Sequence, residues 1–188
     1  LNRYAYVQNN PLRYTDPSGH NHEKPVERAI EAYVCAAMGQ FRCGIAAAIA
    51  HEAGRVAKEL FPENDELSIL LRDAFRHAYG AALMQKYLGS WARYALYAHE
   101  GGPAWMVLTD SLLRDDPKAY WDHKQDFWNN EIGMSIGATM AWKSDKEIAN
   151  AVMEALIEGR LRVVDWRVNQ GFVSSDAAYT EWKRRQAR

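Results

Sequence analysis

The sequence has 188 residues, of which 48% are hydrophobic and 25% are charged, and its formal net charge is −1. This composition predicts a folded chain with one substantial core and excludes a wholly disordered protein. It also lacks the basic excess that draws proteins to a nucleic-acid backbone, so we expect no strong general DNA binding.

The chain has two cysteines, Cys35 and Cys43, and no CxxC pair that would indicate a zinc site. We expect both to be reduced thiols in the core, with a disulfide between them as the less favoured alternative. The longest apolar run, residues 45–50, is far shorter than the roughly 20 residues that span a bilayer. With no signal-peptide pattern at the N-terminus, we predict neither a transmembrane helix nor a signal peptide in this chain.

Residues 1–20 alternate aromatic or aliphatic side chains with polar ones, and the turn sequences NNP and DPSG interrupt the alternation. We therefore expect an extended, β-type tail. The segment LNRYAYVQNNPLRYTDPSG resembles the end of the RHS-repeat-associated core, the shell of Rhs polymorphic toxins. The resemblance is carried by Tyr4, Tyr6, Asn9, Asn10, Pro11, Asp16, Pro17 and Gly19.

In that family the core is a β-cocoon around a variable C-terminal toxin, and an aspartyl autoprotease cuts the chain just after this motif. The resemblance implies that residues 1–20 are the end of an Rhs core and carry the cleavage motif, formed by Pro11, Asp16, Pro17 and Gly19. His20 follows where the family usually has Leu, which leaves the scissile bond itself open.

The same resemblance implies that residues 21–188 are the toxin domain of an antibacterial effector. Such a protein is made in the bacterial cytoplasm, and a specialised apparatus such as type VI secretion delivers it into a target cell. The implied partners are the Rhs shell, the secretion-spike proteins and a cognate immunity protein that protects the producer.

From residue 21 onward the hydrophobic pattern has a period of about 3.6, which predicts helices. Prolines at the helix starts and glycines at the breaks support the boundaries. Only residues 160–173 have an extended pattern. We therefore expect a single, mainly α domain of seven or eight helices, with at most one short β-hairpin. The predicted helices cover residues 25–39, 44–60, 66–88, 91–99, 103–114, 117–142, 145–158 and 175–186.

Two of these helices repeat one polar pattern, and each repeat ends in a glycine. Positions 0, 4 and 7 of the pattern lie on one helix face, and position 3 lies at its edge. If the two faces pack together, the polar residues meet in a partly buried cluster. Burying so many polar groups is costly, so a functional site is favoured over a purely structural hydrogen-bond network. The predicted cluster contains Asp73, His77, Asp126 and Asn130, with Arg76 and Asn129 at its margin and Gly80 and Gly133 at the helix crossing.

His99 and Glu100 are predicted at the end of a helix, just before a Gly-Gly-Pro turn, where side chains can extend into a cleft. Neither this pair nor His51–Glu52 has a second histidine four residues on, so the zinc-peptidase signature is absent. His123 precedes Asp126 by three residues and could join the cluster, but at the start of an exposed helix we expect it at the surface.

The segments DAFRHA, HE and NNEIG also resemble motifs of an uncharacterised helical domain family found at the C-termini of polymorphic toxins and related phage-type proteins. The resemblance covers residues 66–137 and implies a shared site without naming an activity. Its motif positions are Asp73, Arg76, His77, His99, Glu100, Asn129, Asn130 and Gly133.

Histidines and carboxylates from separate helices are a ligand set for a divalent metal that activates water, and His77, His99 and Asp126 are the candidate ligands. A metal-free scheme fits equally, with His77 as a general base oriented by Asp126 while Arg76 and Asn130 stabilise an anion. We expect a hydrolase that acts on a nucleotide, an RNA or a phospholipid. The alternative is a non-enzymatic, membrane-disrupting toxin built on the Ala-rich and aromatic helices.

Overall fold

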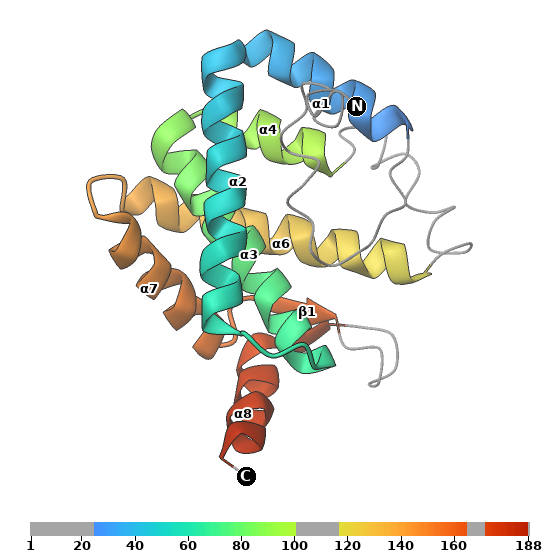
Figure 1. Cartoon of the computed structure of the whole chain (residues 1–188), viewed down its shortest axis with the longest axis vertical. Helices are drawn as coiled ribbons and strands as arrows, with labels where there is room; N and C mark the ends of the chain where they lie inside the picture. The colour runs from blue at the N-terminus through green and yellow to red at the C-terminus, as the bar shows by residue number, and fades with distance from the viewer. Residues whose placement is uncertain (1–24, 101–116, 165–171, 188) are drawn as a thin grey trace, which may run out of the picture.

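The computed structural model describes residues 25–100, 117–164 and 172–187 (Figure 1). Within these ranges it contains seven helices and one two-stranded sheet, so the predicted mainly α fold with a short hairpin is confirmed. The β-type tail predicted for residues 1–20 and the helix predicted for 103–114 lie outside the described residues. The elements are α1 (Pro25–Met38), α2 (Gln40–Leu60), α3 (Glu66–Leu88), α4 (Trp91–His99), α6 (Pro117–Thr139), α7 (Asp145–Ile157), β1 (Arg162–Val164), β2 (Phe172–Ser174) and α8 (Ser175–Gln186).

The helix ends follow from short-range signals in the sequence. Asp65 accepts hydrogen bonds from the first backbone N–H groups of α3 and so caps that helix. At the start of α7, Ser144 and Glu147 form a reciprocal capping box. Gly89 ends α3 with φ at 58°, a left-handed conformation that favours glycine. Because these signals are local, the predicted helix ends differ from the observed ones by at most four residues.

The central helix α3 packs against α2, α4, α6, α7 and α8 (Figure 1). Of its 23 residues, 14 are buried. A helix that is enclosed on most sides has to satisfy its polar side chains inside the protein, because water does not reach them. The polar residues of α3 therefore need partners on the neighbouring helices.

Helices α3 and α6 approach each other most closely at two glycines of α6. A Cβ atom added at Gly133 would overlap the backbone carbonyl of Ala78, and one at Gly137 would overlap that of Ala82. Only glycine at these positions permits this contact between the two backbones. The predicted close crossing at Gly133 of α3 and α6, the two helices that carry the repeated polar pattern, is therefore confirmed.

Cys35 of α1 and Cys43 of α2 form a disulfide, so the expectation of two reduced thiols is wrong. The chain bends sharply between the two helices at Gly39, whose φ of 81° is in the left-handed region. The bend leaves the two Cα atoms 5.3 Å apart, within the range of disulfides. Sequence spacing alone did not indicate the sharpness of this turn.

The hairpin predicted within residues 160–173 is present as β1 and β2, which pair antiparallel with Val163 opposite Val173. Strand β1 lies against α6 and α3. Among the described helices, none combines the length and the apolar character that crossing a membrane requires.

Candidate active site

Three helices contribute to one buried polar cluster. Asp73, Arg76 and His77 project from α3, and Asp126 comes from α6. Glu100 is the C-cap residue, directly after the last residue of α4. His77 and Glu100 are buried, with 8% and 3% of their surface exposed. We call these five residues the acid–histidine cluster.

His77 lies at the centre of the acid–histidine cluster. Its Nε2 is 2.8 Å from Arg76 Nη2, 3.3 Å from Asp126 Oδ1 and 3.7 Å from Asp73 Oδ1. Its Nδ1 is 3.8 Å from Glu100 Oε1. Burial and the positive charge of Arg76 lower the pKa of His77, so the ring is neutral at pH 7. Because a guanidinium can only donate, Nε2 carries the lone pair and the ring proton is on Nδ1, facing Glu100.

The carboxyl groups of the cluster differ in their affinity for protons. Burial opposes the ionisation of Glu100, but the hydrogen bond with His123 and the charges of the neighbouring histidines hold its pKa below the usual range. Burial raises the pKa of Asp126 well above its usual value, and the nearby carboxylates of Glu100 and Asp73 raise it further. The cluster thus combines one stable anion with one carboxyl group that resists ionisation.

His99 does not join the predicted metal set with His77 and Asp126. Its Nδ1 is 2.9 Å from Glu31 Oε1 of α1, and its ring centroid is 6.4 Å from that of His77. Burial opposes the charged form, but the hydrogen bond with Glu31 and the charge of Glu100 raise the pKa of His99 to about 9. The partner on α1 holds the ring as a cation, which is a poor metal ligand.

Asp73 takes the place that His99 was expected to fill. Ligand atoms of Asp73, His77 and Asp126 lie within 4.8 Å of one another, close enough to surround a single metal ion after small side-chain movements. Among the described residues, this is the one group of three or more histidine, cysteine, aspartate or glutamate residues whose ligand atoms lie this close together.

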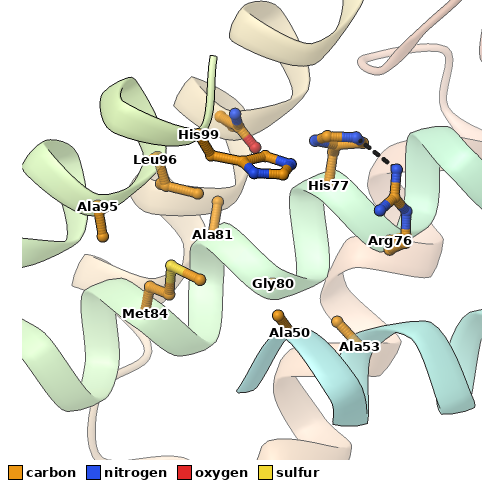
Figure 2. Close-up of a pocket in the computed structure, with 11 residues that line it drawn as sticks. Ala50, Ala53, Arg76, His77, Gly80, Ala81, Met84, Ala95, Leu96 and His99 are labelled. Atoms are coloured by element: carbon orange, nitrogen blue, oxygen red, sulfur yellow. Dashed lines mark hydrogen bonds between the residues drawn. The ribbon is translucent and has the colours of Figure 1, made fainter. Parts of the chain in front are cut away.

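A pocket of about 50 Å³ adjoins the cluster. Figure 2 shows Arg76 hydrogen bonded to His77 on one side of the pocket and His99 facing His77, with the alanines of α2 on the other side. Gly80 of α3 lines the pocket, and a Cβ atom added there would lie 3.5 Å from Ala53 Cβ of α2. The glycine that ends the first polar pattern therefore packs on α2 rather than on α6. A pocket of this size holds a few water molecules or one small group of a larger substrate.

Asn130 lines the same pocket and is 3% exposed. Its Nδ2 donates a long hydrogen bond of 3.4 Å to Glu100 Oε1. Its Oδ1 is buried and accepts no hydrogen bond within the part of the chain that the structure describes. A buried acceptor without a donor is costly, which makes this oxygen a contact point for water or a ligand.

The acid–histidine cluster lies within a recognisable family domain, because residues 34–160 match the family described as a domain of unknown function, DUF6973. The chain belongs to this family. No curated protein and no solved structure matches the chain. The DUF6973 match includes residues 66–137, which carry the three motifs, but it brings no activity with it. The link to polymorphic toxins therefore stays a prediction.

Within the DUF6973 stretch, Asn129 has a different position from the one predicted. It is fully buried, its Nδ2 donates to the Arg162 carbonyl at 3.0 Å, and its Oδ1 accepts from the Arg162 N–H at 2.9 Å. Asn129, at position 3 of the polar pattern, points away from α3 and toward β1. Both its amide nitrogen and its amide oxygen therefore form hydrogen bonds with the backbone of the hairpin. Asn129 is accordingly a structural residue, and its assignment to the margin of the site is wrong.

Two other DUF6973 residues at the site were not among the predicted site residues, although the spacing of His123 from Asp126 had allowed it to join the cluster. Gln125 donates to Asp73 Oδ2 at 2.8 Å and accepts from the Val164 N–H at 2.6 Å, so it connects the site to β1. His123 Nδ1 is 3.2 Å from Glu100 Oε2, and the side chain is 24% exposed, which corrects its expected place on the surface. Both residues lie outside the repeated polar pattern, and the residues that they contact are far away in the sequence.

Proposed function

We propose that this chain is the toxin domain of an Rhs-type antibacterial effector and that the acid–histidine cluster hydrolyses a phosphate-containing substrate. The candidate substrates are a nucleotide, an RNA and a phospholipid. The observation that supports hydrolysis is the Nε2 edge of the buried His77, which faces two carboxylates and a guanidinium beside a pocket.

This arrangement is expensive as a structural network. Within the described residues, the guanidinium of Arg76 pairs with Asp73, and the neutral imidazole of His77 lies between Asp73 and the buried carboxyl group of Asp126, which resists ionisation. Buried charges that serve stability alone are usually matched by partners of the opposite sign. An excess of carboxylates around a neutral histidine is instead typical of sites that bind or activate a ligand.

The chemistry follows from the positions of these groups. Nε2 of His77 and the carboxyl groups of Asp73 and Asp126 surround one point, which a nitrogen of Arg76 approaches in this structure. When Arg76 turns toward the substrate, a water molecule can be activated at this point. The guanidinium of Arg76 is suited to two oxygens of a phosphate group. In the hydrolysis the water oxygen forms the new bond to phosphorus, the cluster takes up the proton of the water, and the leaving oxygen is protonated by solvent.

The assignment to an Rhs effector is supported by the motif in residues 1–19, which lies outside the described residues. It requires that the full-length precursor be cut beside the DPSG turn and that the producing cell contain an immunity protein. Intact-mass measurement of the precursor is expected to show two fragments. A single uncut chain, or harmless expression of the active domain in bacteria that lack the immunity protein, contradicts the assignment.

The catalytic part is tested by expressing the chain in bacteria and measuring growth inhibition and thermal midpoint for His77→Ala and Asp126→Ala. Each substitution is expected to abolish toxicity while the helical fold remains, because catalytic residues that act together each remove nearly the whole activity. His51→Ala, at an exposed position of α2, is the matched control and is expected to stay toxic.

The same variants separate hydrolysis from membrane disruption. Dye release from phospholipid vesicles that is equal for the wild type and both cluster variants would favour the membrane-disrupting alternative. Cleavage products from a nucleotide mixture, from RNA or from phospholipid, lost in both variants, support hydrolysis and identify the substrate class. Toxicity that falls only in proportion to lost folded protein contradicts a catalytic role.

A further inference from the structure

We infer that Asp73, Nε2 of His77 and Asp126 bind one divalent cation of the Mn²⁺ or Zn²⁺ class, and that Arg76 occupies the position of this cation until it binds. The inference deepens the proposed function and rests on it in one respect, because the cation would be the group that activates water in the acid–histidine cluster. The binding itself is a separate property of the protein.

The ligand atoms are already close to the required geometry. A nitrogen and oxygens bound at about 2.1 Å to one ion lie about 3.0–3.4 Å apart in octahedral or tetrahedral arrangements. Here Nε2 of His77 is 3.3 Å from Asp126 Oδ1 and 3.7 Å from Asp73 Oδ1, and the whole set lies within 4.8 Å. Side-chain rotations on α3 and α6 suffice to close the remaining gaps.

The residues behind the ligands are of the kinds found behind metal ligands, with a carboxylate on the far side of the histidine. A histidine that binds a metal through one nitrogen typically donates its other N–H to a carboxylate, which orients the ring. Glu100 Oε1 lies on the Nδ1 side of His77 at 3.8 Å, and Gln125 donates to Asp73 Oδ2 at 2.8 Å. Each of these contacts leaves the atoms that face the proposed cation available.

Arg76 has the contacts that a cation would make. Its Nη2 is 2.6 Å from Asp73 Oδ1 and 2.8 Å from His77 Nε2. A guanidinium nitrogen therefore lies between two of the three ligand atoms and partly neutralises the carboxylates. Arg76 also lines the adjoining pocket (Figure 2). When a divalent ion replaces it, its charge would be available there to an entering anion.

The orphaned oxygen of Asn130 is a second and independent indication of a ligand. Its Oδ1 is buried without a hydrogen-bond donor among the described residues, and the side chain lines the pocket together with Arg76 and His77. Metal-bound water is a strong donor, and three protein ligands leave room for it on the ion. A water in that position would satisfy this acceptor.

Binding is tested with Mn²⁺ alone and the purified full chain, in the absence of any substrate. The unbound ion is followed by electron paramagnetic resonance, and pulsed spectra of the bound ion report coupling to an imidazole nitrogen. We expect one Mn²⁺ per chain, competition by Zn²⁺, and nitrogen coupling that His77→Gln removes. Asp73→Asn and Asp126→Asn are each expected to weaken binding by about 100-fold or more, beyond the loss of an outer partner.

Arg76→Gln is the variant that distinguishes this site from a merely acidic surface. It removes the competing positive charge and is expected to tighten Mn²⁺ binding by about tenfold. Glu158→Gln, an exposed carboxylate variant, is the control and is expected to bind as the wild type does. If circular dichroism shows that an Asp variant does not fold, the Arg76→Gln result and the nitrogen coupling of the wild type decide whether the cation site exists.

Absence of stoichiometric Mn²⁺ binding, or unchanged binding in both Asp variants, overturns the cation site. Unchanged or weaker binding in folded Arg76→Gln overturns the role of Arg76 as the occupant. Substrate hydrolysis that persists in EDTA, together with no Mn²⁺ binding, rejects the cation and leaves the proposed function standing. One bound Mn²⁺ in a wild-type chain that is neither toxic nor hydrolytic supports the cation site and rejects the proposed function.

Discussion

The interface between α3 and α6 has two halves that are built on opposite principles. In the half around Gly133 and Gly137, glycine on one helix meets the backbone of alanine residues on the other. In the half around His77 and Asp126, carboxylates surround a neutral imidazole and a guanidinium. The first half brings the two backbones into direct contact, and the second brings ionisable side chains into contact.

The comparison shows how a small domain can hold several buried charged groups in one place. The glycine half brings the two backbones together, so that His77, next to Ala78 on α3, meets Asp126, two turns before Gly133 on α6, at 3.3 Å. Dense apolar packing elsewhere on α3 supplies stability that offsets the cost of the polar half. Substitutions in the glycine half should therefore lower the stability of the fold, whereas removal of a carboxylate in the polar half should raise stability and abolish activity.

The largest effect is expected from Gly133→Ala. The added methyl group overlaps the Ala78 carbonyl and forces α6 away from α3, which should lower the free energy of unfolding by about 3 kcal/mol. Gly54→Ala is the control, because a Cβ there meets nothing within 4 Å and the helix should gain up to about 1 kcal/mol. Urea denaturation of both variants measures the difference. Equal midpoints would show that the helices are not held in contact at Gly133.

The next effect separates two adjacent residues, one on each side of α6. Asn129→Ala leaves the Arg162 backbone N–H and carbonyl without their partner and should destabilise the fold by about 2 kcal/mol. Asn130→Ala removes one long hydrogen bond and an unsatisfied acceptor, so it should cost less than half as much while reducing activity. Thermal midpoints and growth inhibition measured together test this. A larger loss of stability for Asn130→Ala would reverse the assignment of the two amides.

In the polar half, Asp126→Asn should raise stability by about 1 kcal/mol and abolish toxicity. The wild-type carboxyl group must either bury a charge near Glu100 and Asp73 or take up a proton on folding, and asparagine avoids both. Glu154→Gln, at an exposed position in α7, serves as the control with little expected change. A clear fall in the urea midpoint of Asp126→Asn would mean that the carboxylate stabilises the fold.

The smallest effect concerns the pair between α1 and α4. The pKa of His99 is raised from its ordinary 6.5 to about 9, so the stabilisation by Glu31 is complete below pH 6.5 and is lost as the pH rises through about 9. The thermal midpoint of the wild type minus that of Glu31→Gln should thus shrink between pH 6 and pH 10. Because the His99 side chain is 34% exposed, water screens the pair, and the whole change should stay below about 4 °C. A difference that is constant across this range would show that His99 is not charged by its contact with Glu31.

Local patterns in the sequence were sufficient for the secondary structure. The helix ends at Asp65, Ser144 and Gly89 depend on hydrogen bonds or backbone angles within a few residues, and such signals can be recognised without knowing the fold. The repeated spacing that begins at Asp73 and Asp126 also predicted which two helices cross, because period and glycine position are properties of each helix by itself.

Tertiary structure alone decided which polar residues meet. Asn129 turned to β1 and Gln125 to Asp73 because α6 packs against both α3 and β1, a placement that no single helix encodes. The disulfide and the Glu31–His99 pair arose for the same reason, since both depend on how α1 is placed against α2 and α4. His99 was thereby removed from the predicted metal set and Asp73 entered it, because contacts between side chains far apart in sequence are determined by the packing of whole helices and not by the spacing along any one of them.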